Sequence, residues 1–222
     1  MLLFSPWRGE RICTVVTIMG AAGIPLSSML YFTSDATPRF LLDKGHWADQ
    51  PWWLATFYCH VVAASLSLLI GIPLMVPAWT RRHPAWHRLF GYAYVNAVLW
   101  LAAPTGFLLA LTATGGLLGT LGFGLASVLW WHATWSGYRA IRRTDLPTHI
   151  AAMARSFAFA LSAPAFRLIQ IALSLGSLPD DVVYLVSLWT SVAVSVVLGE
   201  TCAAHVRHPS FIPCPVLPGE PS

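Results

Sequence analysis

The sequence predicts an all-α integral membrane protein, a six-helix transmembrane bundle with the N and C termini in the cytoplasm. Of its 222 residues, 56% are hydrophobic and only 10% are charged, whereas soluble domains carry about 25% charged residues. Six apolar segments are long enough to cross a bilayer as helices. Most of the eleven Trp residues stand near the ends of these segments, as in the aromatic belts at membrane interfaces.

The chain divides into spans joined by polar loops, and the predicted spans are about 12–32, 52–79, 88–112, 117–138, 147–174 and 181–205. The first follows two Arg residues and resembles a signal peptide, but its apolar length exceeds a typical h-region and no clean A-x-A site follows. We therefore favour an uncleaved helix. This gives a cytoplasmic N-terminus over 1–11, a single transmembrane domain over 12–206 and a disordered, proline-rich tail over 207–222.

The orientation of the bundle follows from its basic residues, because Lys and Arg gather in cytoplasmic loops. One side carries nine of them: Arg8, Arg11, Arg81, Arg82, Arg88, Arg139, Arg142, Arg143 and Arg207. The other side carries only Arg39 and Lys44. An even number of spans with both termini in the cytoplasm satisfies this distribution.

The fifth span contains three ionisable side chains, His149, Arg155 and Arg167. A charged group near the bilayer centre costs at least about 2.5–3.5 kcal/mol on insertion scales, so such groups usually face the bundle interior and mark function. His149 and Arg167 are five helical turns apart and are expected on one stripe, separated by roughly 27 Å along the axis.

Depth counting sorts the polar residues into two layers. His60, in the second span, and Arg167 form the outer layer. The inner layer contains His87, His132, His149, Arg155 and Glu200, supported by Tyr94. Arg155 and Glu200 occupy similar depths on consecutive helices, and a buried ion pair is the simplest way to satisfy both. The alternative is a proton or substrate site in which His149 or His132 titrates.

Small residues continue the stripe of His60, namely Ala63, Ala64, Ser67 and Gly71. A His above such a groove could ligate a flat macrocycle, and haem b is the candidate cofactor, with an inner His, either His149 or His87, as the further ligand. The other interpretation is that the small residues let a second helix approach and that the imidazole bonds a backbone carbonyl. Arg167 would anchor a haem propionate or a lipid phosphate, or would extend to the interface.

His83 and His87 are four residues apart, the spacing of two metal ligands on one helix. Pro84 lies between them and suits the first position of a helix, which would place His83 before the helix. Interfacial histidines are therefore favoured here, and no metal site is predicted. The four Cys residues form no CxxC pair and predict no disulfide framework.

Several chemistries are excluded by their missing motifs. The chain has no GxSxG, no P-loop, no HExxH and no GxGxxG after a strand. No span carries two His residues at the spacing that holds two stacked b haems, which argues against a standard two-haem cytochrome. No basic patch interleaved with aromatic residues suggests nucleic-acid binding.

The combination of motifs resembles a family of bacterial predicted membrane proteins known as domain of unknown function 2306. The matching pieces are His60 with Gly71-x-Pro73, Arg81, the run His87-Arg88-x-x-Gly91-x-x-Tyr94, GGLLGTLGFG, YRAIRR from Tyr138, His149-x3-Met153-x-Arg155-Ser156, Arg167, Tyr184, Trp189 and Glu200. The resemblance covers about two thirds of the chain and implies a multi-pass protein of the bacterial inner membrane with no assigned reaction. Ala152 replaces a Trp that members of the family often carry at this position.

Three functions remain open at this point. The first is a haem-associated or membrane redox protein. The second is a proton-coupled small-molecule transporter with a site at His149, Arg155 and Glu200, against which the absence of an inverted repeat counts. The third is a non-catalytic membrane subunit. The expected partners are membrane lipids and either a second copy of the chain or another membrane subunit.

Overall fold

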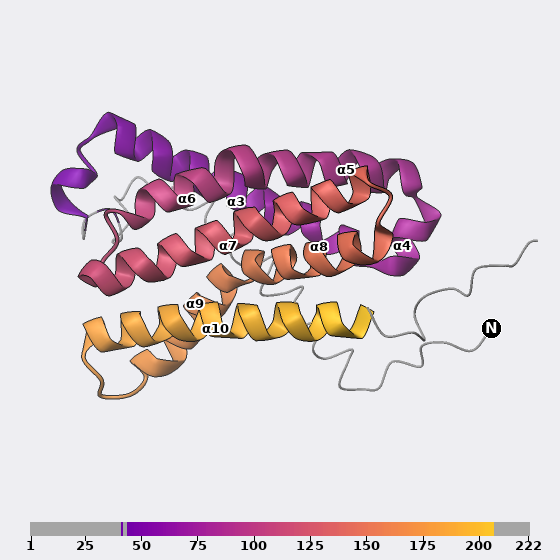
Figure 1. Cartoon of the computed structure of the whole chain (residues 1–222). Coiled ribbons are helices and arrows are strands. Elements are labelled where there is room, and N and C mark those ends of the chain that lie inside the picture. The colour runs from indigo at the N-terminus through magenta and orange to yellow at the C-terminus, as the bar shows by residue number, and fades with distance from the viewer. Residues whose placement is uncertain (1–40, 42–43, 207–222) are drawn as a thin grey trace, which may run out of the picture.

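The computed structural model describes Leu41 and residues 44–206, and every regular element in these residues is helical (Figure 1). A short turn of helix, η1 (Gly45–Trp47), precedes the long helices. They are α3 (Pro51–Leu74), α4 (Pro77–Arg82), α5 (Pro84–Asn96), η2 (Ala97–Ala102), α6 (Ala103–Ala110), α7 (Gly116–Arg142), α8 (Leu146–Ala160), α9 (Ser162–Ser174) and α10 (Asp180–Val206). The segments predicted as the first span and the tail lie outside the described residues.

The starts of these helices follow ordinary rules of capping. Pro51, Pro77 and Pro84 are the first residues of α3, α4 and α5, where the missing N–H has no helical partner in any case. The carboxylate of Asp145 accepts a hydrogen bond from the Thr148 N–H and caps α8. Gly115 precedes α7 with φ of 88°, a left-handed conformation that favours glycine.

The third predicted span is one continuous helix from Pro84 to Ala110 whose middle, η2, is a wider π-type turn. Pro104 follows this turn and has no N–H to donate back to the carbonyl of Leu99, five residues earlier. The indole N–H of Trp131 on α7 donates to that carbonyl instead, at 3.2 Å. The irregular turn is therefore satisfied from a neighbouring helix, as membrane-depth backbone requires.

The fifth predicted span is broken. Helix α8 ends at Ala160 and α9 begins at Ser162, and the two pieces run in different directions (Figure 1). Ala160 lies four residues before Pro164, whose ring clashes with the carbonyl at that position and whose nitrogen cannot bond to it. The expectation of one straight stripe through His149 and Arg167 is therefore wrong.

Four helical segments among the described residues are long and apolar enough to cross a membrane, when α8 and α9 are counted together across their break: Pro51–Leu74, Pro84–Ala110, Leu146–Ser174 and Asp180–Ala204. Helix α7 has 27 residues, but its glycines, Trp side chains and His132 make it less apolar. The described part of this membrane protein is thus all-helical. Six spans, the single domain over 12–206 and the side of the termini stay predictions. Large outward side chains such as Trp100 and Leu117, each 72% exposed, suit a surface in contact with lipid.

The main core lies where α3, α5, η2, α7 and α8 meet. Its centre is formed by Tyr94, Val98, Ala102, Trp130 and Phe157, all buried. Helix α7 contacts both α6 and α8, and α10 packs along α8 and α9 (Figure 1). This arrangement places α7, α8 and α10 around a common space.

Candidate functional site

Helices α8 and α10 approach each other closely because the residues between them are small. A Cβ placed on Gly199 would lie 3.1 Å from the Arg155 Cα and 3.5 Å from the Ala158 Cβ. Side chains of ordinary size at these positions would separate the helices. The close approach brings the polar residues of the two helices within bonding distance.

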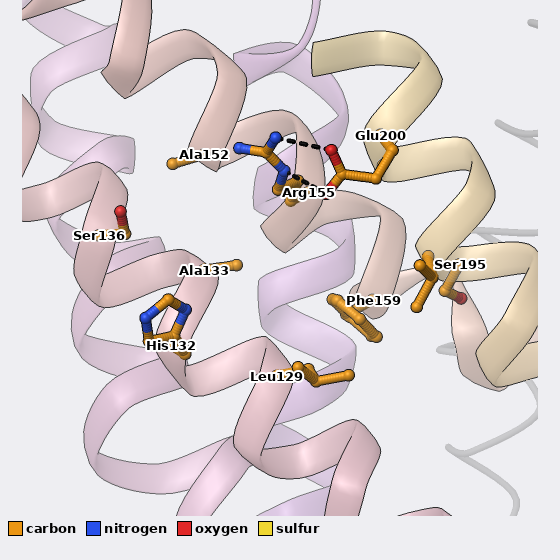
Figure 2. A pocket seen from close by; sticks show the side chains of 11 residues that line it. Leu129, His132, Ala133, Ser136, Ala152, Arg155, Phe159, Ser195 and Glu200 are labelled. Carbon is orange, nitrogen blue, oxygen red and sulfur yellow. Dashed lines mark hydrogen bonds and ion pairs between the residues drawn. The ribbon is translucent and has the colours of Figure 1, made fainter. Parts of the chain in front are cut away.

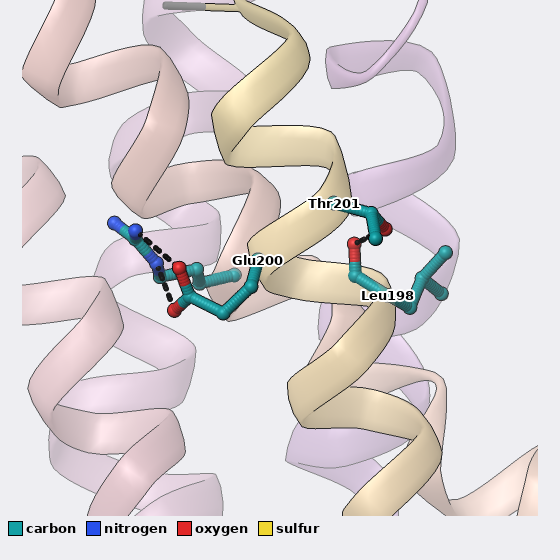
Figure 3. Close-up of polar contacts among 4 residues, drawn as sticks. Leu198, Glu200 and Thr201 are labelled. Carbon is teal, nitrogen blue, oxygen red and sulfur yellow. Dashed lines mark hydrogen bonds and ion pairs between the residues drawn. The ribbon is translucent and has the colours of Figure 1, made fainter.

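Arg155 and Glu200 form an ion pair with two parallel hydrogen bonds (Figures 2 and 3). Nε donates to Oε1 and Nη2 donates to Oε2, each at 2.7 Å. This side-on geometry is the strong form of an arginine–carboxylate contact. The depth-matched pair expected from the sequence is therefore present in the structure.

The two partners differ in exposure. The side chain of Arg155 is 26% exposed and that of Glu200 is 58% exposed. Figure 3 shows Glu200 reaching from α10 towards α8, while the neighbouring Thr201 bonds the carbonyl of Leu198 on its own helix. The carboxylate is thus on the more open side of the pair.

The ion pair lies at the edge of a cavity of about 400 Å³ between α7, α8 and α10 (Figure 2). We call it the α7–α8–α10 cavity. It is lined by Leu129, His132, Ala133, Ser136, Ala152, Arg155, Phe159, Ser195, Val196, Gly199 and Glu200. Most of the lining is apolar, and the polar groups are few, which is the usual composition of a small-molecule site.

One nitrogen of the Arg155 guanidinium is not used by the ion pair. Nη1 has no hydrogen-bond partner among the described residues, and Figure 2 shows it pointing away from Glu200 towards Ala152. On the opposite wall, His132 and Ser136 stand one turn apart on α7. The cavity therefore combines apolar walls with an unused arginine donor.

A sequence model of one family, described as predicted membrane protein and named DUF2306 for its unknown function, matches residues 57–203. The chain belongs to this family. The matched range contains all of the cavity residues, so the site lies within the part that defines the family. No curated protein and no solved structure matches the chain.

Tyr94 of this DUF2306 protein lies in a buried polar network rather than in the cavity. Its hydroxyl is 2.9 Å from the Ser156 Oγ, which is 2.7 Å from the Thr134 Oγ1. Thr134 donates to the Trp130 carbonyl, and the Trp130 indole N–H lies 3.5 Å from the Tyr94 oxygen. The Thr134 hydroxyl already donates its proton to the Trp130 carbonyl. Ser156 therefore donates to Thr134, and Tyr94 donates to Ser156. Every donor in the ring is used once.

Neither Thr134 nor Ser156 was predicted from the sequence as a site residue, although Ser156 stands in the family motif. Both are 0% exposed, and a lone hydroxyl in an apolar helix carries no signal of its own, since it can bond its own backbone. Ser156 directly follows Arg155, so it faces a different side of α8. The network joins α5, α7 and α8 and holds the wall of the cavity in place.

His60 bonds the backbone and its groove is filled. Nδ1 lies 2.9 Å from the carbonyl oxygen of Ala102, at the end of the π-type turn. Gly71 on the same stripe packs against the rings of Phe157 and Tyr94, where a Cβ would collide. The small residues thus admit neighbouring side chains, which is the packing interpretation, and leave no space there for a macrocycle.

His87 and His149 lie near each other at the start of their helices. His149 Nδ1 is 2.9 Å from the Gly137 carbonyl, and His87 Nδ1 is 3.3 Å from the Thr80 hydroxyl. The two imidazoles are close enough to interact electrostatically. No group of three potential metal ligands occurs in the described part of the chain.

Arg167 has its own surroundings on α9. It is exposed, its Nη1 is 3.4 Å from the Gln170 side chain, and its guanidinium lies 5.7 Å from the centre of the Phe166 ring. His60 has different partners on η2 and α6. The structure therefore unites Arg155, Glu200 and His132 around one cavity, and leaves His60 and Arg167 in separate environments.

Proposed function

We propose that this protein binds a small amphipathic molecule in the α7–α8–α10 cavity and carries it within the membrane. The observation that supports this function best is the unused Nη1 of Arg155 at the edge of an apolar cavity. The apolar walls would contact the hydrocarbon part of the ligand, and the Arg155 guanidinium would donate hydrogen bonds to an oxygen-bearing head group.

The break at Leu161 supports carriage rather than static binding. It lies two residues after Phe159, which lines the cavity. In transporters, binding sites are typically formed by discontinuous membrane helices. A hinge next to the cavity would allow α8 and α9 to move separately around a bound molecule.

The test uses three probes of equal chain length: 1-hexanol, hexanoate and hexane-1-sulfonate. Binding is measured by calorimetry with protein in lipid nanodiscs, against empty nanodiscs as the blank. We expect at least one probe to bind, and Ser136→Phe, which fills the cavity, to abolish that binding. Leu121→Phe, at an exposed position of the same helix, is the matched control and should leave binding intact.

A result in which no probe binds, or in which Ser136→Phe binds as well as the original protein, contradicts the proposal. The probe that binds is then added to the solution outside proteoliposomes that contain the protein, and its rate of entry is measured. Faster entry than into protein-free liposomes supports carriage, and equal entry limits the function to binding.

A haem-associated redox function is the second candidate, and one observation favours it. The hydrogen bond from the His149 Nδ1–H to the Gly137 carbonyl leaves Nε2 available, as in metal-ligating histidines. His87 lies within electrostatic range of His149 and is the candidate for a second ligand. Protein purified after expression with supplied haem would show a Soret band, and its absence would remove this candidate.

A further inference from the structure

We infer that the ligand of the cavity is a monoanion, such as a carboxylate, and that Glu200 takes up one proton when the ligand binds. This inference rests on the proposed function, since it names the ligand class and the coupling of the same site. It follows from the hydrogen-bond geometry of Arg155 and from the charge balance of the pair.

The guanidinium group has five N–H donors arranged as forks. Glu200 occupies the fork made by Nε and Nη2. The remaining fork, made by Nη1 and the second N–H of Nη2, has no partner among the described residues, and Nη1 points away from Glu200 (Figure 2). This planar pair of donors matches the two oxygens of a carboxylate or two oxygens of a sulfonate.

The net charge of the site determines whether a proton must bind together with the anion. The ion pair itself is neutral, because Arg155 carries one positive charge and Glu200 one negative charge. An anion on the second fork would leave a net negative charge inside the membrane-spanning bundle, where uncompensated charge is costly. If Glu200 takes up a proton, the positive Arg155, the neutral Glu200 and the negative ligand again sum to zero. One anion and one proton therefore enter the site together.

The exposure of the pair permits this exchange. Glu200 is the more open partner, at 58% against 26% for Arg155, and it lies within the last two turns of α10. A proton that enters from that end of the helix would reach its carboxyl group without separation of α8 and α10. Once protonated, Glu200 can donate its O–H to the ligand or swing away, while Gly199 keeps Arg155 against α10.

Among the described residues, few other titratable groups lie around the site. On α7, His132 lines the cavity. On α8, His149 lies before Arg155 and is bonded to the Gly137 carbonyl. On the described part of α10, the remaining carboxylates are Asp180 and Asp181 at the far end. His132 is the competing proton acceptor, and the experiment must separate it from Glu200.

The experiment measures proton uptake during binding of hexane-1-sulfonate, which stays anionic at all working pH values. Calorimetry in two buffers of different ionisation enthalpy gives the number of protons bound per ligand. We expect about one proton per sulfonate, and an affinity that rises about tenfold for each pH unit of acidification between about pH 8 and about pH 6.

Glu200→Gln should bind the sulfonate without proton uptake and with no dependence on pH, because the amide is already neutral. Asp181→Asn, far from the cavity, should keep both the binding and the proton uptake. His132→Gln tests the competing acceptor and should take up about one proton for each sulfonate that it binds. Loss of uptake in His132→Gln, or its persistence in Glu200→Gln, would overturn the assignment to Glu200. Sulfonate binding to the original protein without uptake would overturn the inference even if Glu200→Gln failed to fold.

The three probes separate the inference from the function on which it rests. If 1-hexanol binds in the cavity and the sulfonate does not, the ligand is not an anion, and the binding function stands while the inference fails. If no probe binds, the function itself fails.

Discussion

Gly199 lies directly against the backbone of Arg155, so that a methyl group at position 199 would come within 3.1 Å of the Arg155 Cα and 3.3 Å of its Cγ. The absence of a side chain at this contact lets α8 and α10 approach closely beside the ion pair and the α7–α8–α10 cavity.

Gly199→Val should therefore destabilise the protein and separate Arg155 from Glu200. Overpacking of this kind costs about 1–3 kcal/mol, measured as a lower midpoint of thermal unfolding in detergent. Gly91→Ala is the matched control, because a Cβ there meets nothing within 4 Å. Equal destabilisation by both changes would show that the contact at Gly199 is not special.

Arg155→Ala and Arg167→Ala should damage different properties, although both residues belong to one predicted span. Arg155→Ala removes the donor of the cavity and leaves Glu200 without its ion-pair partner, so we expect loss of probe binding. Arg167→Ala removes an exposed side chain outside the cavity and should leave binding unchanged. If both variants merely lose stability to the same extent, the charges are structural.

Ser156→Ala should cost about 1–3 kcal/mol, because the Tyr94 hydroxyl then loses its acceptor inside the core. Ser187→Ala is the control. Ser187 is also 0% exposed, but its hydroxyl donates only to the Val183 carbonyl of its own helix. In Ser187→Ala this carbonyl keeps its backbone hydrogen bond within the helix. Unfolding in denaturant compares the two, and a Ser187→Ala variant as unstable as Ser156→Ala would contradict the network.

Pro164→Ala should straighten the break between α8 and α9, since an alanine at this position can donate its N–H to the Ala160 carbonyl. Spin labels at positions 150 and 171, both exposed, report the change as an interlabel distance in a variant without other cysteines. A continuous helix would separate the two backbone positions by about 31 Å. We expect the distance to lengthen on substitution, and an unchanged distance would mean that tertiary contacts alone hold the break.

Much of the fold could be predicted because one-dimensional information determines it. Apolar length and low charge identified the class, and the long described helices lie mainly in the segments expected from hydropathy, whereas η1 and part of α4 lie in predicted loops. The pairing of Arg155 with Glu200 could also be predicted from the sequence, because each residue advances a helix by about 1.5 Å along its axis, independently of the neighbouring helices.

The direction of α9 could not be predicted from the sequence. A proline predicts that a helix breaks, but it does not predict the direction in which the chain continues. The groove of His60 could not be assigned for a related reason. Small residues leave room for either a ligand or a neighbouring side chain. In the structure the rings of Phe157 and Tyr94 pack against Gly71, which excludes a ligand at this part of the groove.

The sequence by itself thus determined a helical membrane protein of the DUF2306 family and the positions of its ionisable residues along each helix. Only the tertiary structure decided which of these residues face one another. Helical rise is a local property, set by backbone hydrogen bonds within each segment. The rotation of each helix about its axis is set by side-chain packing against helices distant in the chain, and that packing placed Arg155, Glu200 and His132 around one cavity and Tyr94 in another environment.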